Sequence, residues 1–229
     1  EFQVSTPRVL TKVIDGVCCE PVERMVADVP EASMGAVIEK IGQRKGDLVS
    51  MTPVGSRYRL EFLVPSRGLF GYRNEFLTDP RGEGSMSSVL DSYCPMKGEI
   101  ARRSTGSLIA FETGEATAYG IGGVQDRGAM FIAPGTPVYA GMIVGSCNRN
   151  EDMAVNVCTK KQLTNMRAAG SDEAVRLVPP RVLSLEQCLE YLADDELLEV
   201  TPQNLRMRKQ ILDHSVRMRQ VMKNRQSGK

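Results

Sequence analysis

The sequence predicts an α+β protein, with a ferredoxin-like β-α-β-β-α-β domain followed by a β-rich C-terminal domain that has one or two helices. Between residues 20 and 93, apolar residues alternate between the spacing of strands and that of helices, and the connections are too short for other elements. After residue 96, glycines recur between short apolar runs, which is typical of short strands and turns. We therefore expect residues 1–16 to be the end of a preceding domain and a linker, residues 17–96 to be the ferredoxin-like domain, and residues 97–229 to form the second domain with a basic tail.

In the ferredoxin-like domain, the first helix is predicted by apolar residues at 34, 37, 38 and 41, which share one helical face. Ser33 lies near its expected start and Gly46 near its expected end. The alternation from Tyr58 to Val64 predicts a half-buried strand. The complete expectation is strands at residues 20–29, 48–54, 58–64 and 85–93, and a second helix at residues 66–77.

In the second domain, one helix is predicted by Ser184 and Gln187, which match a capping box and precede an apolar stripe. Residues 197–208 predict a hairpin, with a helix that begins at Pro202 as the alternative. We expect roughly the last 18 residues to be a frayed basic helix or a disordered tail. The short apolar runs predict strands at residues 107–111, 116–121, 129–132, 138–139, 142–144 and 155–158.

The composition is that of a globular protein, because 41% of the 229 residues are hydrophobic and 25% are charged. No segment approaches the roughly 20 apolar residues of a membrane span, and no export signal begins the chain. We expect a cytoplasmic, monomeric chain without membrane contact, and Glu1 indicates a piece cut from a longer protein. The six cysteines include no C-x-x-C pair and there is one histidine, so we expect reduced thiols and no metal site.

The residues do not predict an enzyme. The glycine-rich segment 119–128 lacks the third glycine of G-x-G-x-x-G, and no P-loop occurs anywhere, so we interpret it as a strand-to-turn connection. The one histidine, His214, lies among arginines in the tail, without a paired nucleophile. The acidic run of residues 194–199 is expected to be a solvated face. We therefore expect no catalytic residue and no cofactor in this chain.

Positive charge is concentrated near the end of the chain. From Thr201 onward there are eight Lys or Arg residues against one acid, a net charge of +7 in a chain whose total is +1. A mildly acidic body with a basic tail favours a polyanionic partner such as nucleic acid. An ordinary solvated tail is the alternative, and the charge asymmetry alone does not decide between them.

A second basic segment, residues 159–173, combines cations with amide and hydroxyl groups that can bond to sugar, phosphate or base edges. It contains no aromatic residue for stacking on bases. An exposed loop without a ligand explains the same residues about equally well. The predicted RNA-binding residues are Lys160, Lys161, Gln162, Thr164, Asn165, Arg167 and Ser171 in this segment, with Arg206, Arg208 and Lys209 in the tail.

Several segments of the first domain resemble the fifth domain of translational GTPases: Glu20-Pro21, residues 33–38 (SMGAVI), residues 44–47 (RKGD) and residues 64–77 (VPSRGLFGYRNEFL). The last of them is similar to the BipA (TypA) branch in particular. Three later segments resemble the carboxy-terminal domain peculiar to the BipA family: residues 125–128 (QDRG), 161–173 (KQLTNMRAAGSDE) and 194–202 (DDELLEVTP).

The resemblance implies a ribosome-associated GTPase that acts in ribosome assembly and in adaptation to cold and other stress. It implies that GTP and magnesium bind an upstream domain that is absent from this chain. It also implies that residues 160–171 touch the acceptor end of A-site tRNA beside 23S rRNA. A small-molecule-sensing or dimerising ferredoxin-like module remains the alternative, although no residue pattern specifies its ligand pocket.

Overall fold

The computed structural model describes residues 1–78, 82–100, 103, 105–160 and 176–226, and the chain divides into two compact units. The N-terminal unit is Pro7–Arg102, and the C-terminal unit combines Arg103–Lys229 with Glu1–Thr6. Residues 1–16 were expected to belong to a preceding domain and a linker. In the structure, β1 (Phe2–Ser5) instead pairs with β13 (Glu196–Val200). The backbone groups of β1 bond to the otherwise free edge of β13.

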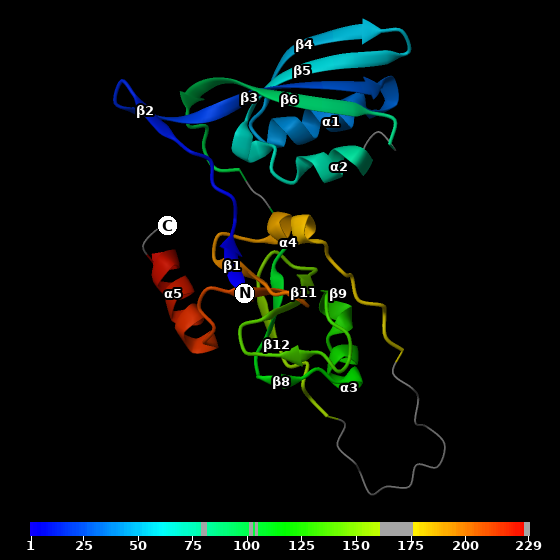
Figure 1. Ribbon diagram of the computed structural model, residues 1–229, viewed down its shortest axis with the longest axis vertical. Helices are drawn as coiled ribbons and strands as arrows, with labels where there is room; N and C mark the ends of the chain where they lie inside the picture. Colours follow the sequence, from blue (N-terminus) through cyan, green and yellow to red (C-terminus); the bar gives the residue numbers. More distant parts are fainter. Residues whose placement is uncertain (79–81, 101–102, 104, 161–175, 227–229) are drawn as a thin grey trace, which may run out of the picture. The chain divides into compact units, whose positions relative to one another are not determined.

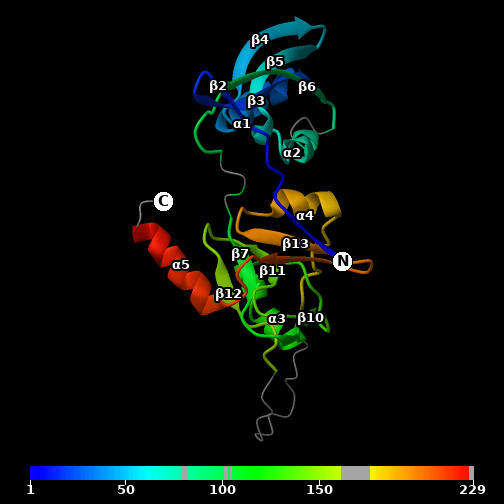
Figure 2. The same ribbon diagram turned by 60° about the vertical axis from the view of Figure 1, so that its left-hand side comes forward.

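The N-terminal unit confirms the ferredoxin-like fold (Figure 1). Four antiparallel strands lie in the order β6-β3-β5-β4, and β2 (Lys12–Ile14) pairs with the first residues of β3. The two helices cover one face of this sheet, as Figures 1 and 2 both show. In chain order the elements are β3 (Val17–Pro30), α1 (Glu31–Gln43), β4 (Asp47–Val54), β5 (Arg57–Pro65), the 3-10 turn η1 (Ser66–Gly68), α2 (Tyr72–Thr78) and β6 (Ser85–Pro95).

The core of this unit follows from the strand alternation. Leu60, Phe62 and Val64 of β5 are buried against Val37 and Ile41 of α1. The other face of the sheet carries ion pairs between strands, such as the one that joins the Arg59 Nε and Asp28 Oδ1 atoms at 2.8 Å. Burial on one face and paired charges on the other set the register of the sheet.

Helix α1 begins at Glu31, two residues before the expected Ser33, because Pro30 holds extended backbone just ahead of it. It ends as predicted before Gly46, whose amide donates to the Ile41 carbonyl at 2.9 Å. A Cβ at Gly46 would lie 2.3 Å from the Ile41 Cγ2 atom, so only glycine fits this close approach. Lys45, with φ of 63°, makes the left-handed turn.

The C-terminal unit contains small sheets, as expected for its β-rich sequence (Figure 2). Its main sheet has the order β12-β7-β11-β9, in which only β12 and β7 are parallel. Its strands are β7 (Ser107–Ala110), β9 (Gly128–Met130), β11 (Ile143–Cys147) and β12 (Met153–Val155). The smaller sheets pair β8 (Gly114–Glu115) with β10 (Pro137–Val138), and β1 with β13 and β14 (Leu205–Lys209).

The described part of this unit holds three α-helices, where the sequence predicted one or two. They are α3 (Ala118–Gly122), α4 (Leu185–Tyr191) and α5 (His214–Gln226), with a 3-10 turn η2 (Gln125–Arg127) after α3. The strand expected at residues 116–121 is wrong, because the Thr117 hydroxyl accepts from the Gly120 amide at 2.9 Å and caps a helix there. The capping box of Ser184 and Gln187 is confirmed, as is the hairpin of β13 and β14.

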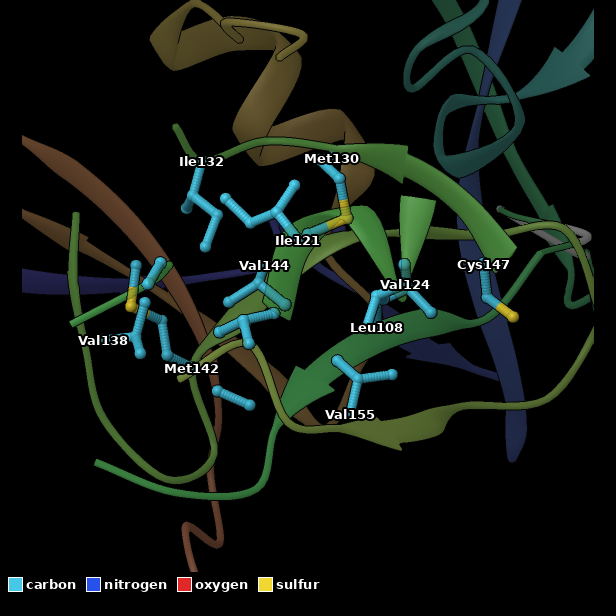
Figure 3. Packing of buried hydrophobic residues seen from close by; sticks show 13 residues of the cluster. Leu108, Ile121, Val124, Met130, Ile132, Val138, Met142, Val144, Cys147 and Val155 are labelled. Atoms are coloured by element: carbon cyan, nitrogen blue, oxygen red, sulfur yellow. The ribbon is translucent and has the colours of Figure 1, made fainter. Parts of the chain in front are cut away.

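The main core of the C-terminal unit gathers one or two residues from each short element (Figure 3). Leu108, Ile121, Met130, Val144 and Val155 come from β7, α3, β9, β11 and β12, and all are buried. A second cluster beneath α4 includes Cys188, Leu192 and Leu198. No helix in the described ranges combines the length and the apolar character that a bilayer crossing requires.

Candidate nucleic-acid interface

Most of the predicted RNA-binding segment lies outside the described residues. Lys160 is described and exposed. Six further predicted residues fall within the range 161–175, of which the structure describes nothing: Lys161, Gln162, Thr164, Asn165, Arg167 and Ser171. The described residues on either side still define where this segment leaves the unit and where it returns.

The departing end, after β12, is held by α3. The Thr117 hydroxyl donates to the Thr159 carbonyl at 2.5 Å, and the Thr117 amide donates to the Val157 carbonyl at 2.9 Å. Gly120 packs directly on this stretch, since a Cβ there would lie 2.3 Å from the Val157 carbonyl oxygen. The first turn of α3 therefore fixes the chain as far as Thr159.

The returning end is held by Gln125 of η2. Its side-chain amide donates to the Arg176 carbonyl at 2.9 Å and accepts from the Val178 amide at 3.1 Å. Three residues later, the Arg181 amide donates to the Met130 carbonyl at 2.8 Å. The glycine-rich segment interpreted as a plain connection is thus the base that holds both ends of residues 160–176.

A hollow of about 440 Å³ opens in this base. Tyr119 on its wall is 48% exposed. Arg127 is also exposed, and its guanidinium contacts the Met153 Sδ atom at 3.5 Å. The same arginine lines an adjoining hollow with Arg149. Sequence reasoning did not predict these residues as a binding site, because only the fold brings Tyr119 and Arg127 to one hollow with Asn156 and Thr159.

Lys209 must be removed from the predicted interface. Its side chain is 3% exposed, and its ammonium lies 2.5 Å from an Asp152 oxygen, 2.9 Å from Asp195 and 3.0 Å from Glu196. Burial alone would lower the pKa of this ammonium, but the carboxylates of Glu196, Asp152 and Asp195 outweigh it and raise the pKa. Lys209 is therefore an internal counter-ion.

Arg208 is removed for the same reason. Its Nε atom lies 2.7 Å from the Glu199 Oε1 atom, and its Nη2 atom donates to the Gln3 side chain at 3.0 Å. The two partners belong to the neighbouring strands β13 and β1, so this guanidinium ties three strands together. Arg206, also on β14, is half-buried and stays a prediction.

The acidic run was expected to face solvent, which is wrong for Glu196. This residue is fully buried, because the hairpin turns every second side chain of β13 inward. Its carboxylate accepts from the Arg103 guanidinium at 3.1 Å, from the Ser107 hydroxyl at 2.9 Å and from the Ala193 amide at 2.8 Å. Together with Lys209, these donors satisfy the buried charge. The described ranges contain no group of three or more His, Cys, Asp or Glu side chains placed to hold a metal.

Comparisons with known proteins fit this division of the chain. Residues 105–214 match the family model described as the TypA/BipA C-terminal domain, and residues 17–104 match the one described as the elongation factor G C-terminus. The chain belongs to the TypA/BipA family. Both matches are to C-terminal domains, and the sequence contains no P-loop.

The TypA/BipA relatives are each named large ribosomal subunit assembly factor BipA. The Bacillus subtilis (strain 168) protein is 50% identical over 230 residues, which cover 100% of this chain and 38% of that protein. The Synechocystis protein is 50% identical over 210 residues (91% and 35%), and the Salmonella typhimurium protein 47% identical over 221 residues (96% and 36%). This chain therefore spans little more than a third of the length of these relatives. A crystal structure of a Thermus thermophilus protein matches 35% of this chain and 12% of its own chain with a TM-score of 0.34 and 21% identity, too low to carry an argument.

Proposed function

We propose that this chain is the ribosome-docking part of a GTPase that assists assembly of the large ribosomal subunit. In this proposal, residues 160–176 and the base that holds them contact 23S rRNA and the acceptor end of A-site tRNA. The names of the relatives support the ribosomal partner. GTP and its magnesium would bind the remainder of the longer protein, which would act in the cytoplasm and in growth under stress. We expect the chain itself to be a monomer without a cofactor.

The observation that carries the proposal is that residues 117–125 hold both ends of a cationic, amide-rich segment. Thr117 fixes Thr159, and Gln125 fixes Arg176 and Val178. Anchored ends reduce the chain entropy that the segment loses when it contacts a partner. Lys160 and Arg176, at the two ends of the segment, and Arg127, two residues after the anchoring η2 residue Gln125, are exposed cations, although the exposed Asp126 lies between Gln125 and Arg127.

RNA is the partner that this chemistry suits best. Each cation that neutralises a phosphate releases condensed counter-ions, so binding should weaken steeply as salt rises. Amides and hydroxyls such as those of Gln162, Thr164 and Asn165 can bond to ribose hydroxyls and to base edges of unpaired nucleotides. The TypA/BipA relatives are named as assembly factors of the large ribosomal subunit, which supports a partner that contains RNA.

The test replaces Lys160, Lys161 and Arg167 together with alanine and measures binding of the 229-residue chain to purified large ribosomal subunits by co-sedimentation. An exposed charge contact contributes about 0.5–1 kcal/mol, so we expect the three changes to weaken binding roughly 10- to 100-fold near physiological salt. The slope of log affinity against log salt should decrease by about 2 to 3.

The matched control removes the same charge elsewhere, by replacing Arg8, Arg57 and Arg73, which are exposed in the N-terminal unit. This variant should bind within about threefold of the unchanged chain, because it loses only long-range attraction. Equal binding by the loop variant and the unchanged chain at every salt concentration would contradict the proposal. A stability increase with small metabolites, and none with ribosomal RNA, would favour the ligand-sensing alternative.

A further inference from the structure

The hollow at the base of residues 160–176 has properties that anchoring the segment does not require. Its volume of about 440 Å³ falls in the range of about 300–1,000 Å³ that is usual for small-ligand sites. One wall includes Gly122 and Gly123, which have no side chain to cover the main chain there, whereas the neighbouring Gly120 is buried against Val157. Thr159, the last anchored residue before the segment, lies on the rim.

Three side chains around the hollow complement the base and the phosphate of a nucleotide. The half-exposed ring of Tyr119 offers an aromatic face on which a base can stack. The Asn156 side-chain oxygen already accepts from the Cys158 amide at 3.0 Å, and its NH2 group has no partner among the described residues. No carboxylate of the described residues pairs with the exposed Arg127, which leaves its guanidinium available to a phosphate.

A second hollow, of about 200 Å³, lies between α5 and the sheet but does not have this character. Its cations are already engaged, because Lys209 pairs with Asp152 and Asp195, and Arg217 donates to the Ile211 and Leu212 carbonyls. An anionic ligand there would compete with these contacts. In the hollow beside Tyr119, a phosphate could pair with Arg127 without displacing a carboxylate of the described residues.

We propose that the hollow formed by Tyr119, Gly120, Gly122, Gly123, Arg127 and Asn156 binds one unpaired nucleotide of an RNA strand. The base stacks on Tyr119 and bonds to the Asn156 amide, while its phosphate pairs with Arg127. The proposal rests on the proposed function, because it identifies which part of the RNA binds to the residues that anchor the segment. With Tyr119, the hollow supplies the aromatic residue that residues 159–173 themselves lack.

Two substitutions test the site without disturbing the fold. Tyr119→Leu keeps apolar bulk and removes the aromatic face, and Tyr119→Phe is its matched control because it keeps that face. Gly123→Leu fills the hollow with a side chain. The position accepts one, since Gly123 has helical φ and ψ of −72° and −10° and a Cβ there would lie 3.7 Å from its nearest neighbours.

The probe is a fluorescein-labelled, single-stranded RNA of about ten nucleotides, a length within the usual site size of single-strand binding proteins. It is titrated with the full 229-residue chain and followed by fluorescence anisotropy. Stacking on an aromatic side chain contributes about 1–3 kcal/mol per base, so Tyr119→Leu should weaken binding roughly 5- to 150-fold, with an unchanged salt slope. Gly123→Leu should weaken it by a similar factor. Tyr119→Phe should bind like the unchanged chain, and circular dichroism melting should show no loss of stability in any variant.

Equal RNA binding by Tyr119→Leu and Tyr119→Phe would overturn the inference, as would undiminished binding by Gly123→Leu or no measurable binding by the unchanged chain. If free nucleoside monophosphates compete as strongly as unlabelled RNA, the claim that the bound nucleotide belongs to an RNA strand is refuted. The hollow would then be a mononucleotide site. Binding to large ribosomal subunits by the variant that lacks Lys160, Lys161 and Arg167 is measured in parallel. If that variant binds weakly while Tyr119→Leu binds normally, only the nucleotide site is refuted, and the opposite result refutes only the role of the segment.

Discussion

At the scale of single residues, the described part of the chain contains two buried carboxylates, Glu20 and Glu196, that are satisfied by similar means in different units. Glu20 is 1% exposed, and it accepts from the Arg67 Nε and Nη2 atoms and, at 2.7 Å, from the Lys97 amide. Arg67 also donates to the Lys97 and Gly98 carbonyls at 2.6 Å. The pair therefore joins the start of β3 to the turn η1 and to the chain that leaves β6. Two of the segments that resemble the translational GTPases thus serve the architecture of the domain.

Replacing Glu20 should change how stability depends on pH. Burial by itself would raise the pKa of this carboxyl, but the hydrogen bonds from Arg67 and Lys97 and their charges outweigh it and lower the pKa below the ordinary 4.5. The stability that Glu20 contributes is therefore fully present above pH 4.5 and is lost as pH falls through the folded-state pKa. Glu20→Gln should cost about 3 kcal/mol at about pH 7 and should lose less stability than the unchanged chain between about pH 5 and pH 3.

Urea unfolding, followed by circular dichroism across this pH range, measures both effects. Glu23→Gln on the same strand is the control and should stay within about 0.5 kcal/mol of the unchanged chain at each pH. A Glu20→Gln variant whose stability falls as steeply with acid as that of the unchanged chain would show that other carboxyls carry this acid sensitivity.

At the scale of elements, the short helix α3 and the 3-10 turn η2 anchor other parts of the C-terminal unit. Together they cover only residues 118–127, yet they fix chain segments that follow β12 and that precede α4. Close backbone approach makes this possible. A Cβ at Gly128 would lie 1.8 Å from the Ser146 carbonyl oxygen, and Gly120 is similarly tight against Val157. Of the glycines in the segment 119–128, Gly120 and Gly128 are needed for this packing, whereas Gly123 has room for a side chain.

Removing the anchor at Gln125 should loosen one end of the segment and leave the element in place. Gln125→Ala deletes two hydrogen bonds at the surface, one to Arg176 and one to Val178. The free energy of unfolding should therefore fall by only about 1 kcal/mol. Hydrogen exchange at the Val178 amide should become roughly tenfold faster, and binding to large ribosomal subunits should weaken about two- to fivefold. Mass-resolved hydrogen exchange and co-sedimentation provide the two measurements.

Gln43→Ala, at the exposed end of α1, is the matched control and should affect neither the exchange of Val178 nor the binding to ribosomal subunits. If Gln125→Ala exchanges like the unchanged chain at Val178, the side chain does not restrain the returning end. The role assigned to η2 would then be wrong.

At the scale of the whole molecule, the two units have separate hydrophobic clusters. Every buried residue of the cluster around Phe62 comes from Pro7–Arg102, and every one of the clusters around Val144 and Leu198 comes from the C-terminal unit. Unfolding of a core is cooperative within the residues that share it. The chain should therefore unfold in two transitions, one for each unit.

Glu196→Gln should shift only one of these transitions. Arg103 and Lys209 would lose the carboxylate they share in a fully buried position, which costs about 3–5 kcal/mol and lowers the melting temperature of the C-terminal unit by roughly 10 °C or more. Differential scanning calorimetry resolves the two transitions, and Glu186→Gln, exposed on α4, should move neither. A shift of both transitions by Glu196→Gln would show that the units unfold as one.

The sequence alone determined the ferredoxin-like unit, because its information is local. Strand alternation from Tyr58 to Val64, a helical face ending at Gly46 and short connections leave one arrangement in which every apolar face is covered. The same holds for the capping box of Ser184, whose partners are three residues apart. Local spacing also identified residues 159–173 as a candidate segment, although it did not reveal what holds them.

Only the tertiary structure decided which charges face a partner and which face the protein. The sequence predicted both Lys209 and Lys160 as RNA-binding cations. Lys209 is buried among Asp152, Asp195 and Glu196, whereas Lys160 is exposed. Tyr119 and Thr159 meet at one hollow although 40 positions separate them in the numbering. These outcomes depend on contacts between distant parts of the chain, whose free energy comes from burial and charge pairing that no local pattern records.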